Sequence, residues 1–225
     1  MNEHISIAID GPAGAGKSTI AKRLAVKLGC IYVDTGALYR TIAYSLLKSG
    51  KDYNDVATVV AHLPGISVNI AYKGDTQIVL LDGEDVSRFI RTPEVSNVAS
   101  VTSAIPEVRA YLLGLQRRLA EENSVVMDGR DIATVVLPNA KVKIFLTASP
   151  EERARRRYVE LKEKGIEANL DEVLADIKDR DYRDSHRDVA PLKQADDAVL
   201  VDTTDKDLEQ AVLAMEEAVK QQLAK

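Results

Sequence analysis

Tryptophan is absent from this 225-residue chain, cysteine occurs once, and aromatic residues make up 4% of the sequence. The single thiol, Cys30, excludes a disulfide within the chain, as is usual for proteins of a reducing compartment. The scarcity of aromatic rings argues against the stacking surfaces that hold single-stranded nucleic acid. A net charge of −5 argues in addition against a broad basic nucleic-acid surface, although it is compatible with a local basic pocket.

Long apolar runs and targeting signals are also missing. No apolar run approaches the length that a membrane-spanning helix needs. The first residues, Met-Asn-Glu-His, lack the basic region with which a signal peptide begins, so we expect a cytoplasmic protein. The three histidines are scattered and show no metal-ligand spacing. The composition, 45% hydrophobic and 29% charged, is that of an ordinary globular protein, and the length suffices for one α/β domain with a modest insertion.

The most informative segment is Gly11-Pro-Ala-Gly-Ala-Gly16-Lys17-Ser18, which matches the phosphate-binding loop pattern Gly-x-x-x-x-Gly-Lys-Ser/Thr in full. Apolar residues 5–9 predict a strand that enters the loop, and residues 17–28 predict an amphipathic helix that leaves it. Because strand, loop and helix agree, a glycine-rich turn without a ligand is a weak alternative. The pattern predicts an ATP-type site formed by Gly11, Pro12, Ala13, Gly14, Ala15, Gly16, Lys17, Ser18 and Thr19.

Two side chains of this loop have predictable roles. The backbone N–H groups of such a loop and the positive end of the following helix face phosphate oxygens. We expect Lys17 to lie on an exposed loop, from which its ammonium reaches the β- and γ-phosphates. The Ser18 hydroxyl is expected to ligate Mg²⁺.

Short apolar runs alternate with helical patterns along the chain. This alternation predicts an α/β fold in which helices cover both faces of a parallel sheet, with ligands at the carboxyl ends of the strands. Residues 63–92 break the alternation: two apolar runs flank Lys73-Gly-Asp-Thr76, which predicts a small antiparallel β insert on a single domain, 1–225. The strands are expected at 5–9, 31–33, 124–127, 142–146 and 198–201, and the helices at 17–28, 37–49, 106–121, 150–164, 170–187 and 205–223.

Two further predicted strands end in polar residues. The run that ends at Asp128 is typical of the carboxylate that reaches Mg²⁺ or its bound water in a phosphate-loop enzyme. Arg130 and Asp131 follow at the same edge, and charges beside a buried strand favour a functional site, because unpaired buried charge is costly. Thr35 and Arg40 follow the strand at 31–33 and have two interpretations: a helix cap and a surface charge, or part of the site.

Arginines are concentrated on two predicted helices, four within residues 151–157 and three within residues 180–187. Such runs are usually a solvated helix face with ion pairs. The predicted phosphate loop favours phosphoryl transfer instead, because forked guanidinium groups stabilise charge on the transferred phosphoryl oxygens. Arg153 and Arg157 are four residues apart and are expected to face the same way.

These segments together resemble the bacterial cytidylate kinases, a family of P-loop nucleoside monophosphate kinases. The resemblance rests on the loop at 9–18, Asp-Thr-Gly-Ala-Leu-Tyr-Arg at 34–40, Asp-Gly-Arg-Asp at 128–131 and Arg-Asp-Tyr-Arg-Asp at 180–184, and it extends over nearly the whole chain. It implies transfer of the γ-phosphoryl group of ATP to CMP, and also to dCMP, with Mg²⁺ as cofactor. It further implies a P-loop core with a five-stranded parallel sheet, a monophosphate-binding insert at 63–92, and a short lid at about 150–166.

The same resemblance implies how the acceptor nucleotide is held. Thr35 stands where some members of the family have serine, and it keeps the hydroxyl group. The residues implied are Arg40, Arg130 and Arg187 for the CMP phosphate, Ser100, Arg109 and Asp131 for cytosine, and Arg180 and Asp184 for the ribose.

Catalysis and binding partners also follow from the resemblance. The catalytic cations implied are Lys17, Arg130, Arg153 and Arg157, and the metal residues are Ser18 and Asp128, the latter through water. The partners implied are the small molecules ATP and CMP or dCMP, without nucleic acid or membrane, and the protein is expected to be a monomer.

Two other interpretations stay open. A P-loop kinase for another small molecule, such as AMP or shikimate, would share the loop but not Asp128-Gly-Arg-Asp131 or the 63–92 insert. A nucleotide-dependent switch such as a GTPase would also share the loop, but the guanine-reading motif Asn-Lys-x-Asp is absent from the sequence.

Overall fold

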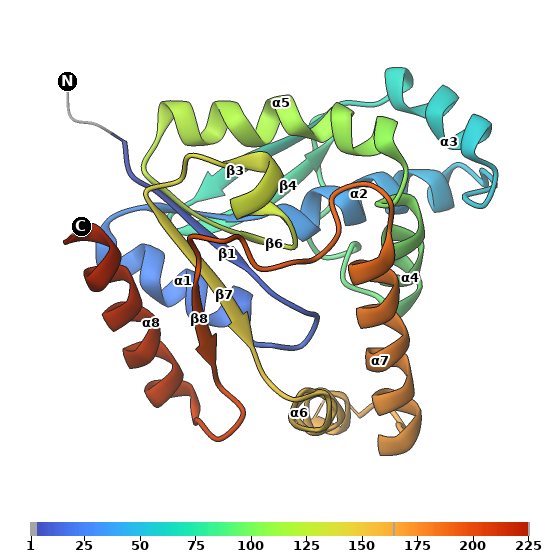
Figure 1. Ribbon diagram of the computed structural model, residues 1–225. Helices are drawn as coiled ribbons and strands as arrows, with labels where there is room; N and C mark the ends of the chain where they lie inside the picture. The colour runs from blue at the N-terminus through green and yellow to red at the C-terminus, as the bar shows by residue number, and fades with distance from the viewer. Residues whose placement is uncertain (1–3, 164, 225) are drawn as a thin grey trace.

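A sheet of five parallel strands forms the centre of the computed structural model, which describes residues 4–163 and 165–224 (Figure 1). The strands are β1 (Ser6–Asp10), β2 (Ile31–Asp34), β6 (Val125–Gly129), β7 (Val142–Thr147) and β8 (Val199–Asp202), in the order β2-β6-β1-β7-β8. All five predicted strands are confirmed, with small shifts of their ends. The predicted ranges 1–225 and 150–166 also include residues 1–3, 164 and 225, which lie outside the described residues.

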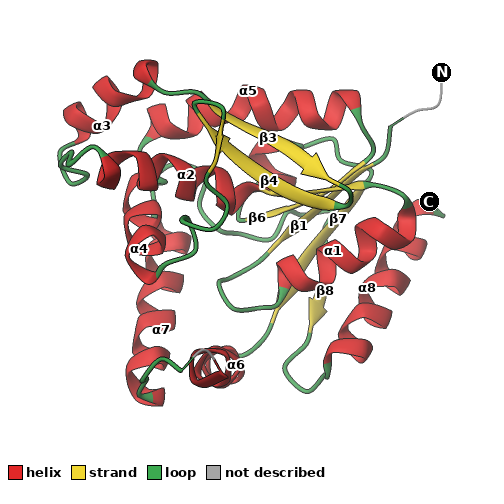
Figure 2. Cartoon of the chain, turned by 180° about the vertical axis from the view of Figure 1, so that it is seen from behind, coloured by secondary structure: helices red, strands yellow, loops and turns green. Residues whose placement is uncertain are grey.

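Helices cover both faces of this sheet, as the alternating pattern predicts (Figures 1 and 2). Successive residues of a strand point to opposite faces, so Ile7 and Ile9 pack with α1 (Lys17–Leu28) and α8 (Leu208–Leu223), whereas Ala8 packs with α5 (Pro106–Glu122). The phosphate loop follows β1 at the carboxyl ends of the strands.

A second core lies beside the sheet and contains the predicted insert. Its three antiparallel strands, β3 (Val68–Lys73), β4 (Thr76–Leu81) and β5 (Glu84–Asp85), pack against α2 (Thr35–Lys48). The Tyr72 hydroxyl donates to the backbone oxygen of Tyr32 over 3.0 Å, and the Gln77 side chain accepts from the Asp34 amide over 2.7 Å. These contacts fix the insert against the exposed edge of β2.

The sequence patterns missed two short helices, α3 (Val56–His62) and α4 (Pro93–Thr102). Both begin with a capping side chain, Asp55 for α3 and Thr92 for α4. Valine, threonine, serine and asparagine dominate them, and these residues have low intrinsic helix propensity. Their helical structure therefore depends on packing in the second core, which sequence periodicity does not reveal over such short lengths.

Two further helices, α6 (Pro150–Glu163) and α7 (Leu170–His186), pack against each other below the carboxyl end of β7 (Figure 1). Short helical turns occupy Leu63–Gly65 and Ile132–Val136, and the latter is a π-helix directly after Asp131. Within the described residues, no helix is both long and apolar enough to cross a membrane.

Candidate active site

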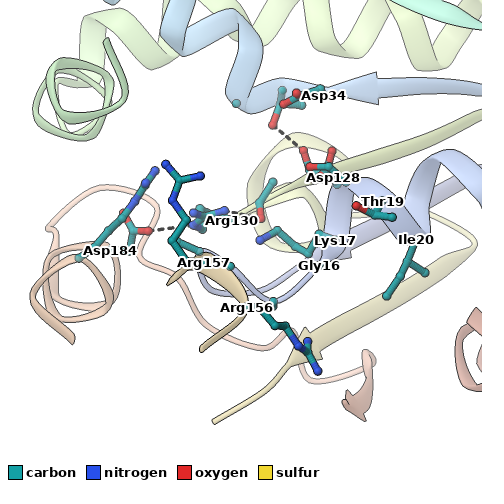
Figure 3. Close-up of a pocket in the computed structure, with 18 of the residues that line it drawn as sticks. Gly16, Lys17, Thr19, Ile20, Asp34, Asp128, Arg130, Arg156, Arg157 and Asp184 are labelled. Carbon is teal, nitrogen blue, oxygen red and sulfur yellow. Dashed lines mark hydrogen bonds and ion pairs between the residues drawn. The ribbon is translucent and has the colours of Figure 1, made fainter. Parts of the chain in front are cut away.

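The carboxyl ends of β1, β2 and β6 open into a cavity of about 680 Å³ (Figure 3). Three predicted residues, Gly11, Pro12 and Arg153, are not among its described lining residues. The structure brings the other predicted site residues together along its walls: Ala13, Gly14, Ala15, Gly16, Lys17, Ser18, Thr19, Thr35, Arg40, Ser100, Arg109, Asp128, Arg130, Asp131, Arg157, Arg180, Asp184 and Arg187.

Lys17 is buried, with 6% of its surface accessible, so the expectation of an exposed loop lysine is wrong. It is the first residue of α1, and its ammonium donates to the backbone oxygens of Gly11 (2.7 Å) and Pro12 (2.8 Å). Burial, and then repulsion from Arg130, hold the pKa of Lys17 well below its ordinary value. The protein therefore compensates the positive charge of the Lys17 ammonium only in part, and this favours binding of an anionic ligand beside it.

Asp128 lies between the loop and β2, and both of its carboxylate oxygens accept hydrogen bonds. The Ser18 hydroxyl donates over 2.9 Å, and the phenol of Tyr32 donates over 2.8 Å. Thr35 donates to the Asp128 backbone oxygen over 2.7 Å, while Asp34 is the N-cap of α2, so Thr35 is not the cap. Burial, and then the negative charge of Asp34, raise the pKa of Asp128, so a cation at this carboxylate would relieve an electrostatic cost.

Asp34, which lines the cavity, binds two arginines. Arg40 and Arg91 each donate to the same carboxylate oxygen over 3.0 Å, from α2 and from the end of the insert. Burial works to raise the pKa of Asp34, but the two guanidinium groups and the Ala37 amide outweigh it and lower the pKa below its usual value. Arg40 is therefore a half-buried, oriented cation rather than a solvated surface charge.

The remaining arginines converge on two buried carboxylates. Asp131 accepts from Arg109 and lies 3.7 Å from Arg187, whereas Asp184 accepts from Arg130 over 2.8 Å (Figure 3). Burial acts to raise the pKa of Asp184, but Arg130 and Arg180 outweigh it and lower the pKa. Burial, and then the charge of Arg130, lower the pKa of Arg180 to about 10.

Several polar atoms in the cavity wall are buried without a hydrogen-bond partner among the described residues. They are the hydroxyl of Ser100, the Nε atoms of Arg40 and Arg180, and one terminal nitrogen of Arg187. Such groups are rare in folded proteins because each costs about 1–3 kcal/mol when left unpaired. Their concentration in one cavity indicates that a ligand with several acceptor atoms completes it.

The arginines of α6 do not share one environment. Arg156 and Arg157 both line the cavity. Arg157 lies beside Glu160 at 2.8 Å, whereas Arg156 donates to Glu152 and to the Thr203 backbone oxygen and extends away from Lys17 and Arg130 in Figure 3. Arg153 is almost fully buried outside the cavity. The expectation that Arg153 and Arg157 face the same way is therefore wrong.

Comparison with known proteins places this geometry in a family. The protein-family model described as cytidylate kinase matches residues 7–221. The chain belongs to the cytidylate kinase family. The cytidylate kinase of Caldicellulosiruptor saccharolyticus is 51% identical over 208 residues, which cover 92% of each chain. That of Caldanaerobacter subterraneus subsp. tengcongensis is 51% identical over 224 residues, covering 98% of this chain and 96% of the other.

The fold of this family member also occurs in more distant proteins. A solved structure of an uncharacterized protein from Eubacterium ventriosum superposes with a TM-score of 0.52 at 16% identity, covering 99% of each chain. At that identity the likeness concerns the α/β fold and not the activity.

Sequence reasoning on this cytidylate kinase family member missed four residues around the site: Tyr32, Tyr39, Gln77 and Arg91. Tyr39 lines the cavity, and the guanidinium of Arg109 lies 5.4 Å from the centre of its ring. Tyr39 stands within the motif at 34–40, which could have singled it out. The other three contact Asp34 or Asp128 from distant parts of the chain, so no local signal identifies them.

Gly11 is a position where the enzyme cannot accommodate a side chain. A Cβ atom there would lie 1.9 Å from the backbone oxygen of Leu146 on the neighbouring strand β7. We expect Gly11→Ala to lower the free energy of unfolding by about 3 kcal/mol or more, because backbone must move to relieve the clash. Urea denaturation measures this, and Gly65→Ala is the control because a Cβ at Gly65 meets no atom within 4 Å. Equal stability of the two variants would contradict the close approach.

Proposed function

We propose that this enzyme transfers the γ-phosphoryl group of ATP to the phosphate of CMP, and also to that of dCMP, giving ADP and CDP or dCDP. One observation carries the proposal: a single cavity joins phosphate-loop residues 13–19 to a second set of guanidinium and hydroxyl groups, several of whose buried donor atoms have no acceptor among the described residues. Two phosphate-bearing ligands in one cavity are what a nucleotide phosphotransferase requires.

Phosphoryl transfer requires the protein to orient the two substrates and to neutralise their negative charge. The attacking group is the CMP phosphate, whose second pKa is about 6, so it is largely a dianion at neutral pH and needs no general base. The enzyme must hold two polyanions in line and neutralise the charge on the transferred group. We assign this task to Lys17, Arg130 and Arg157, which line the cavity together.

The residues present fit a magnesium ion. Mg²⁺ takes few protein ligands and keeps water and phosphate oxygens around it. The Ser18 hydroxyl and the Asp128 carboxylate would hold it, the latter through water, and no cluster of three acidic, histidine or cysteine ligands occurs among the described residues. When bound with ATP, Mg²⁺ supplies neutralisation of charge on the β- and γ-phosphates.

The acceptor site divides by chemistry into three parts. We assign the CMP phosphate to Arg40, Arg130 and Arg187, with the Thr35 hydroxyl nearby, because these donors line the same cavity as the phosphate loop. Cytosine is assigned to Ser100, Arg109 and Asp131, which together offer hydroxyl, guanidinium and carboxylate groups. Arg180 and Asp184 are assigned to the ribose.

Movement around the cavity and the state of assembly complete the proposal. The insert at 63–92 would bind the monophosphate, and residues 150–166 would act as a lid that excludes water, which otherwise hydrolyses ATP. We propose a cytoplasmic monomer that acts on free nucleotides, and sedimentation measures the assembly state.

A coupled assay of ADP release tests the proposed function across CMP, dCMP, UMP, AMP and GMP. We expect turnover with CMP and dCMP to exceed that with the other acceptors clearly. A preference for AMP would indicate a different monophosphate kinase. ATP binding without any phosphorylated acceptor would indicate a nucleotide-binding module instead.

Arg40→Ala and Arg130→Ala are expected to weaken CMP binding far more than ATP binding. Each substitution removes a cation that we assign to the CMP phosphate. A charge-assisted hydrogen bond contributes about 1.5–3 kcal/mol, or roughly 10- to 150-fold in affinity. Calorimetric titration with each nucleotide in the absence of the other measures the two affinities separately. The exposed Arg183→Ala is the control, and a comparable loss of ATP affinity in the two variants would count against the assignment.

A further inference from the structure

Arg153 is the one predicted catalytic arginine that the cavity does not include. Its side chain is 3% exposed, and each of its three nitrogens donates to the protein. Nε donates to the Ala148 oxygen (2.8 Å), one terminal nitrogen to the Ala13 oxygen (3.1 Å) and to Asp181 (3.0 Å), and the other to Asp181 (2.6 Å). Protein acceptors thus satisfy all three nitrogens of this guanidinium, whereas the Nε atoms of Arg40 and Arg180 in the cavity wall have no partner among the described residues.

The contact with Ala13 acts on the phosphate loop through one peptide group. In a trans peptide the C=O of one residue and the N–H of the next point in opposite directions. Arg153 holds the Ala13 oxygen on the outer side of the loop, so the Gly14 N–H is turned toward the opposite side, where the loop lines the cavity. A Cβ on Gly14 would lie 3.3 Å from the Arg153 Cβ, so the arginine stem stands directly against the back of the loop.

Asp181 fixes the guanidinium in this orientation. It lies on α7, which packs against α6 (Figure 1), and it accepts from both terminal nitrogens of Arg153. A bidentate carboxylate defines the plane of a guanidinium, which a single contact does not. Arg153 is buried and Asp181 is 25% exposed, so loss of the Asp181 carboxylate would leave a buried guanidinium without its charged partner.

We propose that Arg153 is a positioning residue, which orients the Gly14 peptide of the phosphate loop toward ATP and does not itself touch a phosphate, and that Asp181 holds Arg153 in place. The proposal deepens the proposed function, on which it rests, at its ATP-binding side. It separates Arg153 from Arg157, which lies at the cavity.

Asp181→Asn and Arg153→Lys test the proposal by direct titration of ATP and of CMP, each alone, with the folded protein. Asparagine keeps the size of Asp181 but loses one acceptor and the charge, and lysine keeps the charge of Arg153 but loses the fork. We expect each variant to bind ATP about tenfold more weakly, with CMP affinity changed less than threefold. Asp179→Asn, which breaks the exposed pair of Asp179 with Arg183 on the same helix, is the matched control and should leave both affinities unchanged.

Two results would overturn the positioning role of Arg153. If Arg153 contacted phosphate directly, Asp181→Asn would free the guanidinium and leave ATP binding unchanged or tighter, which would overturn the proposal. If the pair of Arg153 and Asp181 were purely structural, breaking it would lower the melting temperature, but the folded variants would bind ATP and CMP as tightly as the wild-type protein does. That result would also overturn the proposal. Failure of the wild-type protein to bind ATP would instead reject the proposed function, so the two failures are distinguishable.

Discussion

Lys17→Ala should lower kcat by about 10²- to 10³-fold or more with CMP and ATP, the range found when a single charge-stabilising donor is removed from an active site. The ammonium lies at the start of α1 and is buried, and charge interactions of buried groups are stronger than those in bulk solvent. It now donates to loop carbonyl oxygens, and phosphate oxygens are stronger acceptors for the same protons.

The fold should survive this substitution although Lys17 is buried. Burial is the largest influence on its lowered pKa, which means that the folded protein disfavours the charged form. Its removal therefore costs less stability than the loss of a well-paired buried charge. Steady-state kinetics and the melting temperature are measured together, with the exposed Lys22→Ala as control. A Lys17→Ala enzyme with near-normal kcat would show that the phosphate-loop assignment is wrong.

Asp131→Ala should reduce the preference for CMP over UMP by about 10²-fold in kcat/KM, since several kcal/mol of discrimination arise when a buried polar group loses its partner. Cytosine carries a donor amino group at N4, where uracil carries an acceptor oxygen. One oxygen of Asp131 accepts from Arg109, and the other lies 3.7 Å from Arg187, beyond hydrogen-bond distance. That second oxygen is the one that we expect to accept from the cytosine amino group and to repel uracil.

An orienting role for Asp131 makes a different prediction. The structure pairs Arg130 with Asp184, and Asp131 with Arg109 and Arg187, so Asp131 does not orient Arg130 through an ion pair. If Asp131 did no more than hold those two arginines, both substrates would lose kcat/KM equally. An unchanged CMP-to-UMP ratio in the variant would therefore reject the base-reading role. Asp179→Asn, on the exposed face of α7, controls for a general loss of negative charge.

The amino-acid sequence by itself determined the features that depend on neighbouring residues. The phosphate loop is specified by Gly11, Gly14, Gly16 and Lys17 between an apolar run and an amphipathic helix, and each of the five strands by a short apolar run. Because parallel strands open their carboxyl ends at one edge, the sequence also placed the polar residues after β2 and β6 in one cavity.

The tertiary structure decided which side chains act on ligands and which on one another. Arg153 and Arg157 are equivalent by helical spacing, yet the first turn of α6 passes behind the phosphate loop and against α7, so only Arg157 reaches the cavity. Tyr32 and Arg91 contact Asp128 and Asp34 across 96 and 57 residues of sequence. The burial of a side chain and its choice of partner depend on contacts between residues that are far apart in the sequence. A local sequence pattern does not predict such contacts.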